Sequence, residues 1–160
     1  METLLFDPED VEKSLDVSSA IDAVEDAFEA HATGGSVMPP KSYIDLPEHN
    51  GDFRAMPAYV DDSAGLKWVN SHPDNPEEHD LPSVMGVMVY SDPETAYPLA
   101  IIDGTSLTRY RTGAAAGVAT RYLAHPDSES FGILGAGAQA HTQVDAVTSL
   151  SEVGIERVVV

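Results

Sequence analysis

The chain has 160 residues, of which 42% are hydrophobic, a length and composition typical of a folded domain and unlike those of a disordered segment. It contains no cysteine, which excludes disulfides, thiolate metal ligands and cysteine nucleophiles. No stretch offers the ~18–20 consecutive apolar residues of a membrane-spanning helix, and no signal peptide is visible. We therefore expect a soluble, cytoplasmic protein without membrane contacts.

Acidic residues dominate the charge, because 27 acids stand against 8 lysines and arginines and give a net charge of −19. A field of this sign repels phosphate backbones, so no nucleic-acid partner is expected. The acids are spread along the whole chain, and lysine occurs only at positions 13, 41 and 67. This pattern favours adaptation to molar salt, where the Debye length falls to about 3 Å, and leaves an ordinary acidic protein as the alternative.

Two helices and a series of strands are predicted in the first hundred residues. Asp7 and Pro8 are typical of a helix start, and a helix is expected from there to residue 15. A second helix, with an apolar stripe at helical spacing, is expected over residues 18–33. Strand-like runs follow at 43–46, 53–60, 65–70, 84–90 and 99–102. Turn residues at 92–95 predict a hairpin between the last two runs.

An alanine-rich helix is expected over residues 105–124, and a short polar segment with a proline follows at 125–130. We place a domain boundary in that segment. After it, residues 131–134 form an apolar run of the kind found in parallel sheets. A glycine-rich turn, a helix to about residue 150 and a β-branched strand at 155–160 complete the chain.

The order strand, G-x-G-x-x-A, helix, strand predicts the opening of a dinucleotide-binding βαβ unit. Gly135 permits the tight turn, and Gly137 lets backbone amides approach a pyrophosphate. Ala140 occupies the position where the helix packs on the strand. Unpaired amides at the helix N-terminus then bind the anion. The alternative is a glycine-rich turn of another α/β domain, such as a methyltransferase.

The acidic residue that would hold the adenosine ribose is expected at the end of the second strand, and the sequence ends there at Val160. We therefore expect these 160 residues to be the N-terminal portion of a longer enzyme. The choice between NAD and NADP depends on residues beyond Val160. A two-stranded Rossmann portion has exposed edges, so the isolated fragment is expected to be inactive.

Five motifs stand together in an order known from one enzyme family. They are Phe53–Tyr59, Gly65–Pro76, Leu81–Val84, Leu107–Ala115 and Gly135–Ala140. On these motifs the chain resembles the ornithine cyclodeaminase/mu-crystallin family, and is most similar to its archaeal-type alanine dehydrogenase branch. The similarity covers essentially all 160 residues.

The resemblance implies an α/β protein in two parts. Residues 1–125 would form an α+β substrate-binding and dimerisation domain, and residues 126–160 the first β-α-β part of a Rossmann NAD(P)-binding domain. The implied partners are a small amino or keto acid, a second copy of the chain, and NAD, with NADP possible. The implied activity is an NAD(P)-dependent oxidoreductase of small amino or imino acids, with L-alanine converted to pyruvate and ammonia favoured.

Three alternatives remain within the family. One is an ornithine cyclodeaminase, which converts L-ornithine to L-proline and ammonia with catalytic NAD. The second is a ketimine reductase. The third is a non-enzymatic dinucleotide-binding protein like the crystallin members.

Lys67 is the candidate catalytic residue. It lies in the middle of an apolar strand, where desolvation suits a lysine to exchange protons, although a lysine snorkelling from a strand edge is the alternative. It matches the family lysine that donates and accepts protons and contacts the substrate. Lys41 lies close in sequence to the position of a family arginine that binds the substrate carboxylate, so it is a second substrate-binding candidate. A lysine keeps the positive charge of that arginine but lacks its bidentate guanidinium.

Arg54 is the residue that bears on substrate choice. The resemblance implies that ornithine cyclodeaminases have a glutamate at the position of Arg54, where it meets the second ammonium of the substrate. An arginine repels that ammonium and attracts the carboxylate of a keto acid, which favours the alanine dehydrogenase branch. A surface arginine paired with one of the many acids is the alternative.

Arg111 matches a family arginine that reaches the cofactor phosphate or the substrate carboxylate, whereas Arg109 is expected to be structural. The remaining cofactor-binding candidates are Ser83, Thr112, Gly135, Gly137, Ala138 and Gln139. The histidines and acids between residues 72 and 80 have no fixed ligand spacing and lie in an expected loop, so no metal site is predicted.

Overall fold

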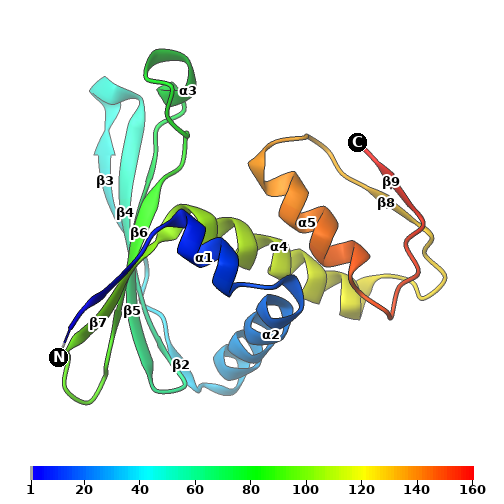
Figure 1. Ribbon diagram of the computed structural model, residues 1–160, viewed down its shortest axis with the longest axis horizontal. Coiled ribbons are helices and arrows are strands. Elements are labelled where there is room, and N and C mark those ends of the chain that lie inside the picture. The colour runs from blue at the N-terminus through cyan, green and yellow to red at the C-terminus, as the bar shows by residue number, and fades with distance from the viewer. Residues whose placement is uncertain (1) are drawn as a thin grey trace. The chain divides into compact units, whose positions relative to one another are not determined.

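The computed structural model describes residues 2–160, which divide into two compact units (Figure 1). The first comprises residues 1–11 and 30–107, and the second residues 12–29 and 108–160. Three helices begin in one unit and end in the other: α1 (Pro8–Ser14), α2 (Val17–Thr33) and α4 (Gly104–Leu123). These units are defined by which residues pack together. The boundary expected between a substrate-binding domain (1–125) and a cofactor-binding domain (126–160) stays a prediction.

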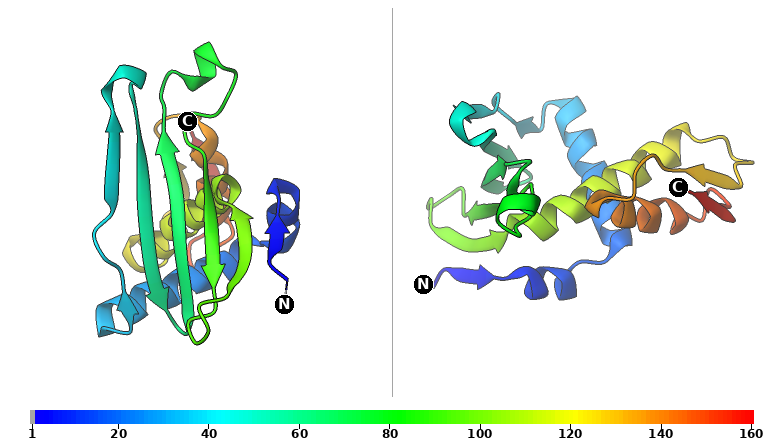
Figure 2. Two further views of the ribbon diagram at one scale, coloured as in Figure 1. Left: turned by 90° about the vertical axis from the view of Figure 1, so that its left-hand side faces the viewer. Right: turned by 90° about the horizontal axis from the view of Figure 1, so that it is seen from above.

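The first unit is built on a seven-stranded sheet in the order β1-β7-β6-β5-β4-β2, with β3 also paired to β4. All neighbouring strands are antiparallel except β1 and β7, and the strands lie side by side in the left view of Figure 2. The strands are β1 (Leu4–Phe6), β2 (Ser36–Val37), β3 (Ser42–Leu46), β4 (Gly51–Val60), β5 (Ser63–Ser71), β6 (Gly86–Ser91) and β7 (Pro98–Asp103). The five longer strands and the β6–β7 hairpin confirm the predictions.

Two short elements of this unit were not predicted, and one expected loop is partly helical. β1 and β2 are too short to show a period of two. The segment that we expected to be a loop contains α3 (Asn75–Glu78), one turn with a proline near its start and two acids in that turn. A 3₁₀ turn (η1, Pro47–His49) joins β3 to β4.

Carboxylates cap three of the helices. Asp7 before α1, Asp16 before α2 and Asp103 before α4 each accept a hydrogen bond from the backbone N–H three residues later, at 2.9, 2.9 and 2.7 Å. The cap predicted at Asp7 is therefore confirmed. A capping side chain satisfies an amide that the helix leaves unpaired, and its negative charge favours the positive end of the helix dipole.

The second unit has a helical core beside a two-stranded parallel sheet. β8 (Ser130–Gly132) pairs with β9 (Arg157–Val159), and α5 (Ala138–Thr148) connects them. Its core holds Ile21, Ala114, Val118, Ala146 and Leu150, which are all at most 8% exposed. This arrangement confirms the predicted βαβ unit. No helix in residues 2–160 is long and apolar enough to cross a membrane.

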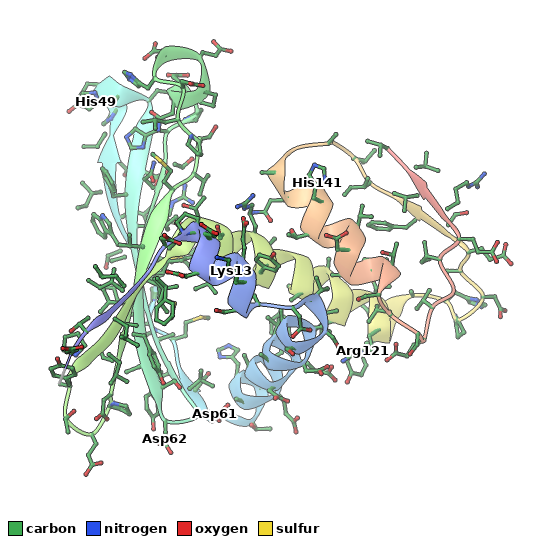
Figure 3. The ribbon with its side chains drawn as sticks, in the orientation of Figure 1. Lys13, His49, Asp61, Asp62, Arg121 and His141 are labelled. Carbon is green, nitrogen blue, oxygen red and sulfur yellow. The ribbon has the colours of Figure 1, made fainter. Side chains whose placement is uncertain are left out.

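Arg121, labelled in Figure 3, lies among three carboxylates of this unit. It pairs with Glu25, with Asp22 at 3.4 Å and with Glu152 at 3.3 Å. The hydrogen bond to Glu25 is the main cause that raises the pKa of Arg121. One arginine thus ties α2, α4 and the segment after α5 together.

Candidate functional site

Arg54 and Lys67 share one face of the sheet in the first unit. Arg54 on β4 lies directly opposite Val69 on β5, and Lys67 lies directly opposite Met56. Side chains of directly opposed residues point to the same face, and the diagonal separation on that face is about 7–8 Å. The register therefore makes the two predicted substrate-binding cations diagonal neighbours.

Lys67 is half-buried between two methionines. Met56 lies opposite it on one side, on β4, and Met88 lies opposite it on the other side, on β6. These thioether side chains are apolar, so they limit the contact of the lysine with water along both neighbouring strands. A desolvated amine of this kind is suited to exchange a proton with a bound molecule.

Arg54 is held from two sides. Its Nη2 donates to Oδ2 of Asp52 at 2.6 Å, and its guanidinium carbon lies 5.5 Å from the centre of the Tyr43 ring. The hydrogen bond to Asp52 raises the pKa of Arg54, although burial opposes the shift. Neither supporting residue was predicted from the sequence. The available signal was spacing, since Asp52 stands two residues before Arg54 and therefore on the same face of the strand.

Lys41 is exposed and also lies near this tyrosine, with Nζ 6.0 Å from the centre of the Tyr43 ring. The structure therefore brings all three substrate-binding candidates of the first unit, Lys41, Arg54 and Lys67, to one region of the sheet. The carboxylate nearest to Arg54 there, Asp52, already forms an ion pair. A region with this balance of charge attracts an anion.

Ser83 lies half-buried in the segment between α3 and β6. Its carbonyl oxygen accepts a hydrogen bond from the backbone N–H of His72 at 2.7 Å. The side-chain Oδ1 of Asn70 accepts a second bond from the N–H of Met85 at 3.0 Å. These bonds fix the segment that carries Ser83 to the end of β5.

A polar cavity of about 350 Å³ lies beside this segment in the first unit. His49, at the tip of the β3–β4 hairpin (Figure 3), is one of its lining residues. Other lining side chains are Asn50, His72, Asp74, Glu78 and His79. Across residues 2–160, no three or more histidine and carboxylate side chains are grouped closely enough to hold a metal ion.

The glycine turn of the second unit leaves the start of α5 open. Gly135 has a φ of +99°, a conformation that L side chains rarely adopt. Gly137 is the N-cap residue of α5, which has no side-chain cap, and a Cβ at position 137 would meet no atom within 4 Å. In contrast to the three carboxylate-capped helices, α5 has no side-chain cap over its first amides, and Gly137 borders open space. This combination fits an anionic group such as a pyrophosphate.

Ala138 and Gln139 are the first two residues of α5. The Oε1 atom of Gln139 is buried and has no hydrogen-bond partner in residues 2–160. On α4, the hydroxyl of Thr112 donates to the carbonyl oxygen of Thr108 at 2.7 Å. The structure thus places Gln139 at the open helix start, whereas it gives the Thr112 hydroxyl a partner within its own helix.

The side chain of Arg111 on α4 forms no ion pair or hydrogen bond within the described part of the chain. The residue keeps an exposed surface, yet partial burial of the guanidinium lowers the pKa of Arg111. Its neighbour Arg109, by contrast, pairs with Glu12 at 3.2 Å. α4 contacts α5 where Gly113 meets Thr142. At about 100° per residue, Arg111 lies roughly 200° around the helix from Gly113 and so points away from that contact. An unpaired arginine in a chain with 27 acids is available to an anionic ligand.

Known proteins match the chain along its whole length. The profile of the ornithine cyclodeaminase/mu-crystallin family matches residues 1–160. Alanine dehydrogenase of Archaeoglobus fulgidus is 47% identical over 154 residues, which make up 96% of this chain and 47% of that protein.

Two solved structures have the same fold. An archaeal alanine dehydrogenase dimer with bound NAD superposes with a TM-score of 0.90 at 47% identity, over 96% of this chain and 47% of that one. A Δ1-pyrroline-2-carboxylate reductase from Thermococcus litoralis, in complex with NADH and L-proline, superposes with a TM-score of 0.92 at 40% identity, over 98% of this chain and 48% of that one. The chain spans about half the length of the relatives that it matches.

Proposed function

The chain belongs to the ornithine cyclodeaminase/mu-crystallin family, and we propose that the full-length protein is an NAD-dependent oxidoreductase that converts L-alanine to pyruvate and ammonia. The observation that carries the choice of substrate is the position of Arg54 on the same sheet face as Lys67. The similar proteins include an alanine dehydrogenase and an imino-acid reductase with bound NAD or NADH, which supports the broader class of activity.

The charge around Arg54 favours a substrate with a single ammonium group. Lys41 and Arg54 both lie within about 6 Å of the Tyr43 ring centre, and Lys67 lies diagonally across from Arg54. The carboxylate next to Arg54, Asp52, is engaged by it at 2.6 Å. The second ammonium of ornithine would therefore meet a cation, whereas the carboxylate of alanine or pyruvate would be attracted. This balance is our reason to prefer the dehydrogenase over the cyclodeaminase.

We propose that the open start of α5 binds the pyrophosphate of the cofactor, through the backbone of Gly135, Gly137, Ala138 and Gln139. The positive φ of Gly135 and the open space at Gly137 fit such a group. Ser83, Thr112 and Arg111 remain further cofactor-binding candidates, and Arg111 suits an anionic group of either ligand. When bound, the nicotinamide supplies a hydride acceptor or donor.

In the proposed reaction, Arg54 and Lys41 bind the substrate carboxylate and orient the α-carbon. Loss of a hydride from that carbon and a proton from nitrogen gives an imine, to which water adds. Lys67 accepts a proton from this water or from the resulting hydroxyl, and returns a proton to the departing ammonia. The overall balance is L-alanine, water and NAD⁺ going to pyruvate, ammonium, NADH and one proton.

We further propose that a second copy of the chain covers the other face of the sheet. That face carries exposed apolar side chains, which is unusual for a monomer and typical of an interface. They are Leu5, Ile44, Tyr59, Leu66, Trp68, Val87 and Ile101. The similar archaeal alanine dehydrogenase is a dimer, which supports this choice of partner.

The test supplies full-length protein with NAD and either L-alanine or L-ornithine, and follows NADH and proline separately. We expect NADH to accumulate with alanine, and Lys67→Met to abolish it while cofactor binding persists. Lys13→Met changes an exposed lysine of α1 and serves as the control. Proline formed from ornithine without net NADH would place the protein among the cyclodeaminases. Cofactor binding without turnover of any amino or imino acid would indicate a non-enzymatic protein.

A further inference from the structure

Asp52 and Arg54 form an ion pair on the sheet face that carries Lys67. Nη2 of Arg54 and Oδ2 of Asp52 are 2.6 Å apart, and their side chains are 32% and 19% exposed. Asp52 is two residues from Arg54 on the same strand, so both side chains leave the same face of β4. The carboxylate thus reaches the guanidinium from within its own strand and needs no distant element to hold it.

Each partner keeps one buried polar atom that has no hydrogen bond within residues 2–160. These are Oδ1 of Asp52 and Nε of Arg54. An unsatisfied buried donor or acceptor destabilises a fold by about 1–3 kcal/mol. A pair with two such atoms is therefore a poor means of stabilising the sheet, and its presence needs another explanation.

The Tyr43 ring supports the same guanidinium. Tyr43 lies directly opposite Arg54 on β3, and its ring centre is 5.5 Å from the guanidinium carbon. The ring restrains the guanidinium by a cation–π contact, while Asp52 fixes Nη2 by a hydrogen bond. Arginine has five N–H donors in a rigid fork, so a guanidinium fixed by these two contacts still has donors for an anion.

We infer that Asp52 is a positioning residue, which holds the guanidinium of Arg54 in the orientation that binds the substrate carboxylate. Tyr43 is the second support. This inference rests on the proposed function, in which Arg54 binds that carboxylate. It assigns Asp52 no contact with the substrate.

Neutralising Asp52 should change KM for pyruvate in opposite directions for a positioning role and for a purely electrostatic role. If Asp52 only diminished the positive charge of the region, its neutralisation would strengthen the attraction for a carboxylate and lower KM for pyruvate. If Asp52 positions Arg54, neutralising Asp52 lets the guanidinium move and raises KM, because a misplaced guanidinium binds the substrate carboxylate less well. The sign of the change in KM therefore separates the two roles.

The experiment measures kcat and KM for pyruvate in the reductive direction, and inhibition by oxalate, in the full-length enzyme. For Asp52→Asn we expect KM and the inhibition constant of oxalate to rise about ten-fold or more, with a smaller change in kcat. Asp52→Glu, which keeps the acceptor charge, should recover part of the loss. The matched control is Asp45→Asn, since Asp45 lies directly opposite Asp52 on the same face and its side chain forms no ion pair or hydrogen bond in residues 2–160.

A second variant guards against loss of folding. Tyr43 is 51% exposed, so Tyr43→Leu is expected to fold, and it should raise KM about two- to five-fold through loss of the cation–π contact. If Asp52→Asn fails to fold and Tyr43→Leu leaves KM unchanged, the inference is wrong. It is equally wrong if Asp52→Asn lowers KM or behaves like Asp45→Asn in an active enzyme. A wild-type protein that turns over no amino or keto acid would instead overturn the proposed function.

Discussion

Gly113 of α4 lies so close to Thr142 of α5 that a Cβ at position 113 would stand 2.4 Å from the Thr142 carbonyl oxygen. The hydroxyl of Thr142 in turn donates a hydrogen bond to the carbonyl oxygen of Arg109, at 3.0 Å. The two helices thus meet backbone to backbone, and the neighbour that a larger residue would strike cannot move aside like a flexible side chain.

We expect Gly113→Ala to destabilise the protein, although the same change inside an unobstructed helix stabilises it by about 0.5–1 kcal/mol. Overpacking costs about 1–3 kcal/mol, so the free energy of unfolding should fall by about 1–2 kcal/mol. Urea unfolding of the full-length protein measures this change. Gly154→Ala is the control, because a Cβ there meets no atom within 4 Å. An unchanged or higher stability for Gly113→Ala would contradict the close contact.

Gly137→Val tests the cofactor site in the second unit. A Cβ at position 137 meets no protein atom within 4 Å, so the variant should fold with an unchanged thermal midpoint. The branched side chain would occupy the space assigned to the pyrophosphate, and we expect NADH affinity to fall by a hundred-fold or more, on the order of 3 kcal/mol. Fluorescence titration with NADH measures the affinity, with Gly154→Val as the control. Unaltered binding would argue against the dinucleotide site.

The sequence predicts where the strands lie but not how they are registered. Asp61 and Asp62, labelled in Figure 3, form the two-residue turn between β4 and β5, with φ values of 46° and 57°. Such a turn requires positive φ at both central residues, and asparagine–glycine is its usual sequence signal. Two consecutive aspartates are not a sequence signal for this type of turn. The diagonal placement of Arg54 and Lys67 follows from this turn, so it could not be anticipated.

The glycine turn was predictable because its chemistry is local. Gly135, Gly137 and the start of α5 lie within four residues of sequence, and an apolar run directly precedes this glycine turn. The supports of Arg54 are different, since Tyr43 reaches it from another strand and its contact depends on the β3–β4 register. Local motifs can therefore be predicted from sequence here, whereas cross-strand contacts need the structure.

Asp103, the cap of α4, should make stability depend on pH. Partial burial opposes its ionisation, but hydrogen bonds from Ser106 and Thr105 outweigh this and lower the pKa of Asp103 below its usual range. A carboxyl with a lowered pKa in the folded state stabilises the fold above its unfolded pKa of about 4, and the contribution disappears as the pH falls through the lowered value.

The corresponding measurement compares wild type with Asp103→Asn at neutral pH and at successively lower pH. Asparagine also caps helices well, so the variant loses mainly the charge–dipole attraction, about 0.3–1 kcal/mol at neutral pH. The difference in unfolding free energy should shrink as the pH falls. Asp26→Asn controls for net charge, since Asp26 is an exposed residue of α2 whose side chain forms no hydrogen bond in the described chain. A constant difference would exclude the assigned role of the carboxylate.

Salt should stabilise the full-length protein. With 27 acids against 8 lysines and arginines, repulsion between like charges opposes folding in dilute buffer, and molar KCl screens it to within about 3 Å. The ion pairs of Arg121 act in the opposite direction, since screening weakens them as well. Repulsion dominates because the acids far outnumber the bases, so the thermal midpoint should rise with KCl. An unchanged thermal midpoint between dilute buffer and molar KCl would indicate an ordinary acidic protein that is not adapted to molar salt.

Arg54→Glu tests the choice of substrate. If position 54 faces the substrate, this change replaces repulsion of a second ammonium by attraction, worth on the order of a few kcal/mol before desolvation at an intermediate dielectric constant. Turnover of alanine and pyruvate should weaken, and relative use of ornithine should improve. The pocket must also accommodate a longer side chain, so an efficient cyclodeaminase is not expected.

The Arg54→Glu variant also places a second carboxylate next to Asp52. Asp52, at 2.6 Å from Arg54, would stand beside the new glutamate, and two neighbouring carboxylates repel each other or share a proton. The double variant Arg54→Glu/Asp52→Asn removes that repulsion and should show the larger shift toward ornithine. Arg54→Met, which removes the charge without reversing it, is the control. The measurement is kcat/KM for both substrates in the full-length enzyme at high salt. An unchanged ratio in the double variant would mean that position 54 does not face the substrate.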